Sequence, residues 1–66
     1  MRADREKLTL AMARDCANPA DVAKMAEMPV QTVNRVLLGR SVRPATLGKI
    51  AKALGVDVAE LLKEGE

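Results

Sequence analysis

Apolar residues recur along this sequence at spacings of three and four, and no run shows the apolar and polar alternation of a strand. One apolar stripe predicts an amphipathic helix over about Asp4–Arg14. Another predicts a helix that starts at Pro44 and stops at Gly55. The stripes consist of Leu8, Ala11 and Met12 in the first helix, and of Leu47, Ile50, Ala51 and Leu54 in the second.

Two shorter helices are predicted between these. Asn18 can cap a helix and is followed by Pro, so a helix is expected over about Pro19–Ala26. Pro29 announces a further start, and the run Val30–Leu38 ends at Gly39, which suits a left-handed C-terminal cap. The two helices are separated by a break of only about three residues.

A fifth short helix is predicted after Asp57, because Glu60 follows at the spacing of a capping box. The pattern therefore indicates an all-α fold, a compact domain of five helices that occupies residues 1–66 without linkers or repeats. The apolar residues of the last helix are Val58, Leu61 and Leu62.

Composition agrees with one small folded domain. The chain has 66 residues, 48% of them hydrophobic and none aromatic, so a single modest core is expected, which a partner subunit would help to stabilise. The single cysteine, Cys16, cannot close an internal disulfide, and is expected to be a small buried apolar residue. No apolar run is long enough for a membrane span or signal peptide, so we expect a cytoplasmic protein without membrane contact.

Enzyme chemistry is not supported by the residues present. The chain has no histidine, one cysteine and no carboxylates clustered around it, so it lacks both a general base near neutrality and a metal-ligand set. Its four glycines are scattered singly and form no phosphate-binding loop. We therefore expect no catalytic residues, no metal, no cofactor and no small-molecule ligand.

Charge is distributed unevenly, although the net charge is only +2. Residues 1–27 are neutral in sum, and residues 57–66 are acidic. Residues 28–56 contain five basic residues and no acidic residue, which is the pattern expected where a protein meets phosphate. Chance clustering in a short chain is the alternative.

The most informative segment is 19–38, where two short helices are joined by a tight break. Ala23 is small, as a close crossing of these helices requires. The residues spaced to line the inside of the crossing are Val22, Ala26, Met28, Val33 and Val36. Those left on the outside of the second helix are Val30, Gln31, Asn34 and Arg35.

The sequence resembles the Cro and lambda-repressor type of the helix-turn-helix family over nearly its whole length. The resemblance implies a sequence-specific regulator of transcription, with repression as the expected mode, that binds double-stranded DNA. It also implies that the helix from Val30 lies in the major groove and that the loop after Gly39 lies against the DNA backbone. The matching residues are Val22-Ala23, Met28, Thr32-Val33-Asn34, Val36, Gly39, the loop 40–44 and the ending 50–58.

The sequence departs from the family pattern in three ways. Glu27 stands where a turn glycine is usual, so it must adopt a positive φ or the turn must differ. Pro29 replaces a hydroxyl-bearing helix cap. Met12 and Leu37 replace an Arg–Glu pair, and we predict that these two apolar side chains touch, since replacing both partners of a buried ion pair costs little.

Candidate DNA contacts fall into two groups. Gln31 and Arg35 can make bidentate bonds to adenine and guanine, and Asn34 and Val30 are further base-contact candidates. The simpler alternative is a solvated polar surface, or packing in the case of Val30. Phosphate contacts are expected from Asn18, Thr32, Arg40, Ser41 and Arg43, for which plain solubility is the alternative.

The predicted last helix carries more apolar surface than one short helix can bury, so we expect a two-fold dimer. The dimer interface is expected at Val58, Leu61 and Leu62. An alternative function remains open: the same fold could serve as a protein–protein interaction module without binding DNA. The absence of acidic residues around the helix 30–38 favours DNA.

Overall fold

The computed structural model describes residues 1–64 and contains four α-helices followed by one turn of 3₁₀-helix, with no β-strand element in that range. Within the same residues no helix is long and apolar enough to cross a membrane. The elements are α1 (Arg5–Arg14), α2 (Pro19–Met25), α3 (Val30–Leu37), α4 (Pro44–Leu54) and the 3₁₀ turn η1 (Val58–Glu60). The all-α class and the bounds of the first four helices are as the sequence predicts.

Each helix starts where its sequence supplies a cap or a proline. The Asp4 carboxylate accepts the backbone N–H of Lys7 at 3.1 Å and so caps α1. At α2 the N–H of Asn18 donates to the Asp21 carboxylate at 2.9 Å, so the backbone of the predicted N-cap residue is bonded to the first turn of the helix. Pro29 precedes α3 as its N-cap and contributes no side-chain cap.

All four α-helices end in the same way, with a left-handed residue and two backbone bonds of the Schellman type. In α2 the N–H of Met28 donates to Ala23 O at 2.9 Å, and the N–H of Glu27 donates to Lys24 O at 3.3 Å. The left-handed residues of the four ends are Cys16, Glu27, Gly39 and Gly55. Glu27, with φ of 55°, therefore adopts the positive φ that the sequence allowed as one alternative.

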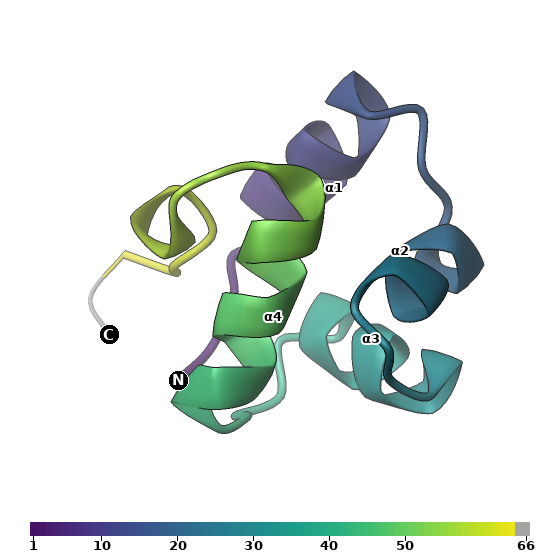
Figure 1. The fold of residues 1–66 in the computed structure, drawn as a ribbon. Coiled ribbons are helices and arrows are strands. Elements are labelled where there is room, and N and C mark those ends of the chain that lie inside the picture. Colours follow the sequence, from purple (N-terminus) through teal and green to yellow (C-terminus); the bar gives the residue numbers. More distant parts are fainter. Residues whose placement is uncertain (65–66) are drawn as a thin grey trace.

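The core lies between α4 and the three helices before it. Figure 1 shows α4 in the middle of the molecule, with α1 behind its upper end and α2 and α3 beside it. α2 packs on both α3 and α4, and α1 packs on α3. The predicted stripes of α1 and α4 and the predicted inner side of the α2–α3 crossing are buried, except for Met28, which is half-buried against the core.

The first and last described segments lie side by side. Ala3 forms an isolated antiparallel bridge with Leu62, and the N–H of Asp4 donates to Leu61 O at 2.7 Å. The Lys7 ammonium donates to Leu62 O at 3.2 Å. These bonds fold the end of the chain back against the start of α1.

Three sequence predictions need correction. The fifth helix is only the single 3₁₀ turn Val58–Glu60, although the capping box predicted from Asp57 and Glu60 is present. Leu61 is completely buried within this chain, and its carbonyl accepts the N–H of Asp4, so its side chain is not available for the predicted dimer interface. Val58 and Leu62 are half-buried and pack against the same core.

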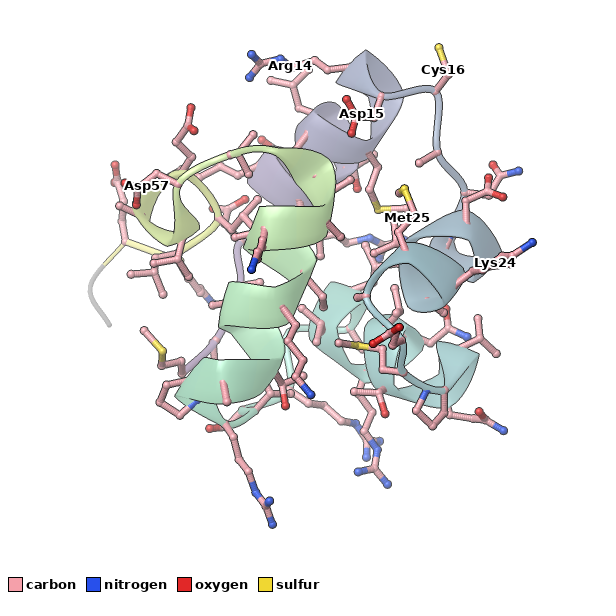
Figure 2. All side chains as sticks on the ribbon, in the orientation of Figure 1. Arg14, Asp15, Cys16, Lys24, Met25 and Asp57 are labelled. Carbon is pink, nitrogen blue, oxygen red and sulfur yellow. The ribbon has the colours of Figure 1, made fainter. Side chains whose placement is uncertain are left out.

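The third correction concerns Cys16, which is exposed rather than buried. It occupies the left-handed position after α1, and Figure 2 shows its side chain pointing away from the ribbon. Because α1 ends at Arg14, Cys16 does not continue the buried stripe of Leu8 and Met12, so the apolar character of cysteine does not lead to burial there.

Met12 is buried and Leu37 is half-buried against the core. Both line one depression between α1 and the end of α3, which agrees with the predicted apolar replacement of an ion pair. Their direct contact stays a prediction.

Candidate nucleic-acid interface

The packing of α2 on α3 determines which side of α3 is free. Val33 and Val36 are fully buried against α2 and the core, so α3 cannot rotate without exposing them. The side chains between them point outward. Gln31, Asn34 and Arg35 are exposed, and Val30 is 38% exposed, as the sequence predicts.

A depression lies between this free side of α3 and the loop that leads into α4. Two arginines from different elements, Arg35 of α3 and Arg43 of the loop, line it together. Three residues with hydroxyl groups line the same place. The complete lining consists of Thr32, Arg35, Ser41, Val42, Arg43 and Thr46.

The electrostatics of this depression favour an anion. No carboxylate lines it, and the first turns of α3 and α4 contain no acidic residue. Arg43 is the N-cap of α4, so the positive end of that helix dipole lies next to it. Arginine and hydroxyl groups at a helix N-terminus are the usual ligands of phosphate oxygens in protein–DNA interfaces.

The loop that carries these groups is held by hydrogen bonds at both ends. Gly39 and Arg40 cap α3, and the N–H of Arg40 donates to Arg35 O at 3.1 Å. The N–H of Val42 donates to Met1 O at 2.7 Å. Ser41 Oγ accepts from the Met1 amino group at 3.3 Å, which leaves its hydroxyl hydrogen able to donate to a phosphate.

The predicted phosphate-contacting residues are only partly brought together. Thr32, Ser41 and Arg43 share the depression, and Arg40 is exposed in the same loop. Asn18 lines a different depression, with residues of α1 and Leu37, and its N–H is bonded to Asp21. A phosphate at Asn18 would therefore lie next to a carboxylate, which makes it the weakest of the five candidates.

Thr46 is a lining residue that sequence reasoning missed. It lies in the first turn of α4 and lines the depression together with Thr32 and Arg35 of α3. The sequence did contain a signal for it, because a hydroxyl group in the first turn of a helix that follows a basic loop is a candidate phosphate contact.

Two short helices joined by a tight turn, the second with an exposed outer side, define a helix-turn-helix domain. The chain belongs to the helix-turn-helix family, whose sequence profile matches residues 1–61. The resemblance to the Cro and lambda-repressor type is thus confirmed. Membership of this family implies nucleic-acid binding.

Solved structures give a second comparison. The chain is similar to part of native PhpD with cadmium atoms, at 29% identity and a TM-score of 0.84. A mutant of hydroxyethylphosphonate dioxygenase gives 29% identity and a TM-score of 0.85. In both cases all of this chain is covered, but only 14% of the other chain. A comparison with curated protein sequences gives no match.

Proposed function

We propose that this chain is a sequence-specific regulator of transcription, acting as a repressor, which binds double-stranded DNA with α3 in the major groove. The observation that carries the proposal is the pairing of two surfaces on α3 and the loop after it. Gln31, Asn34 and Arg35 form an exposed polar side of α3, and the acid-free depression at Arg35 and Arg43 lies directly beside it. A base-reading surface flanked by a phosphate site is what groove recognition needs.

In this proposal the two groups of residues have different tasks. Gln31 and Arg35 read base edges by bidentate hydrogen bonds, Asn34 adds a polar contact, and Val30 contacts a thymine methyl group. Thr32, Arg40, Ser41 and Arg43 bind phosphates and fix the position of α3 without reading sequence. The protein acts in the cytoplasm without a cofactor, metal or catalytic residue, and binds its site as a homodimer.

The direct experiment is selection from random duplex DNA at increasing salt concentration. The proposal predicts enrichment of a near-palindromic sequence whose half-sites lie about one helical turn, roughly 34 Å, apart. Affinity should fall steeply with salt, because each phosphate contact releases counterions. Enrichment of no sequence above the input library would contradict sequence-specific recognition.

A second candidate function is a protein-interaction module. It is supported by the similarity to a small part of PhpD and of hydroxyethylphosphonate dioxygenase, since there the same fold forms 14% of a chain named as an enzyme. This candidate predicts that the chain binds duplex DNA no better than an unrelated basic protein of similar size at physiological salt. It also predicts that Gln31→Ala leaves DNA binding at that same background level.

A further inference from the structure

We infer that the exposed side of α1 is a self-association surface, on which two copies of this chain pair their α1 helices antiparallel about a two-fold axis through Leu10. Leu10 is 64% exposed although it lies in the middle of a ten-residue helix. It therefore places one large apolar side chain at the centre of a helix side that is otherwise polar.

The charges that flank Leu10 indicate that the partner of this surface is a second copy of the chain. Glu6 and Arg14 lie four residues before and after it, on the same side of the helix. An antiparallel two-fold axis at Leu10 brings Glu6 of one copy opposite Arg14 of the other, and the reverse, with about 12 Å of helix between the two pairs. A second copy therefore meets complementary charge at both ends of the contact.

Both charged side chains are free to make these pairs. Within residues 1–64 neither Glu6 nor Arg14 has a side-chain hydrogen bond or ion pair, and both are exposed. Figure 2 shows Arg14 projecting away from the molecule at the upper end of α1. The charges do not serve an intramolecular pair, because Glu6 and Arg14 are two turns apart on one helix.

The surface also has a shape that can receive a side chain. A shallow depression beside Leu10 is lined by Arg5, Glu6, Thr9, Leu10 and Ala13. In a two-fold contact the Leu10 of each copy packs at the depression of the other, since the same patch is used twice. Figure 1 shows α1 in the upper part of the molecule and α3 in the lower part, and no residue of α3 lines this depression.

This surface differs from the apolar residues Val58, Leu61 and Leu62 that the sequence suggested. Leu61 is completely buried, whereas Leu10 is mostly exposed, so α1 offers the apolar surface that the end of the chain does not. Self-association through α1 does not depend on α3, and it is tested without DNA, so its failure leaves the base-reading role of α3 untouched. It does bear on the homodimer of the proposed function, because a chain that stays monomeric has no dimer formed before it meets DNA.

The test is sedimentation equilibrium of the 66-residue chain over a concentration range that reaches high micromolar. The parent is expected to form dimers, and Leu10→Ser is expected to raise the dimer Kd by about 30-fold, as for a central interface residue. Met25→Ser is the matched control, because Met25 is also apolar and 47% exposed but lies on α2. A parent that is monomeric throughout, or a dimer unaffected by Leu10→Ser, overturns the inference.

A charge exchange between copies tests the orientation. Glu6→Arg and Arg14→Glu should each weaken self-association by about tenfold, because like charges then face each other at both ends. An equimolar mixture of the two variants should form heterodimers at parental affinity. Glu6 and Arg14 also have favourable positions relative to the α1 dipole, and loss of that effect alone would weaken both variants without any recovery in the mixture. Absence of recovery therefore overturns the antiparallel pairing.

A cross-link provides a readout that does not depend on affinity. In a Cys16→Ser background, Leu10→Cys should form a disulfide-linked dimer under mild oxidation, because the two-fold axis brings the two copies of this position together. Met25→Cys in the same background should remain monomeric. Equal cross-linking of both variants would indicate random collision and contradict the proposed axis.

Discussion

Arg35 and Arg43 come from different elements but line the same depression, one from α3 and the other from the loop that leads into α4. No carboxylate shares that depression with them. Two guanidinium groups that line one depression without an acidic partner favour an anion from outside the chain. In the proposed function Arg43 binds a phosphate of duplex DNA here while Arg35 reads a base edge beside it, so the relationship between these two residues links the fold to that function.

The loop arginines should contribute to affinity but not to specificity. Arg43→Ala and Arg40→Ala are expected to weaken binding to every duplex and to lower the slope of log affinity against log salt by about 0.9 for each phosphate that is no longer bound. Lys24→Ala is the matched control, because Lys24 is exposed on α2 and lines no part of the depression. Salt titration by fluorescence anisotropy measures the slope, and an unchanged slope in both arginine variants would exclude phosphate contacts at these positions.

The turn between α2 and α3 carries backbone strain at Glu27. Its φ of 55° is costly for a residue with a Cβ, so Glu27→Gly should raise the stability by about 1 kcal/mol, or about 4–8 °C in Tm. Glu27→Ala removes the same carboxylate but keeps the Cβ, and should bring no such gain. Thermal unfolding followed by circular dichroism compares the two variants; equal Tm values would mean that the charge, not the backbone, decides the effect.

Leu61 should act as a core residue and not as an interface residue. Leu61→Ala is expected to lower the free energy of unfolding by about 2–5 kcal/mol, because the side chain is completely buried and its removal leaves a cavity. Leu10→Ala, at a largely exposed position, should change the unfolding of the dilute monomer by less than about 0.5 kcal/mol. Urea unfolding at low protein concentration gives both values. A Leu61→Ala variant as stable as the parent would contradict the burial of this residue in the monomer.

Much of the fold follows from local signals in the sequence. Pro19, Pro44, Gly39 and Gly55 mark helix ends because their backbone preferences act within a few residues. Which side of each helix is buried follows from the spacing of the apolar residues alone. The last turn was harder to predict, since residues 61–63 pair with residues 2–4, which have no periodicity and lie far away in the sequence.

The candidate site likewise has one part that local sequence signals predict and another that depends on contacts between separate segments. The exposed side of α3 could be predicted, because Val33 and Val36 fix how the helix is rotated. The depression could not, since it forms only when the loop brings Arg43 and Thr46 next to α3. Cys16 is the opposite case: its apolar character predicts burial, but it lies beyond the end of α1 and is exposed.

The central claim is that α3 reads bases while the loop binds phosphates, and one titration tests it most directly. The parent, Gln31→Ala, Arg35→Ala, Arg40→Ala and Arg43→Ala are measured against a selected site and a scrambled duplex at several salt concentrations, with folding verified by circular dichroism. The α3 variants should lose about 1–3 kcal/mol of discrimination at one base pair, while their binding to the scrambled duplex changes less. The loop variants should lose affinity for both duplexes and retain specificity. If all four variants bind both duplexes as the parent does, α3 is not a recognition helix, and the protein-interaction function replaces the one proposed.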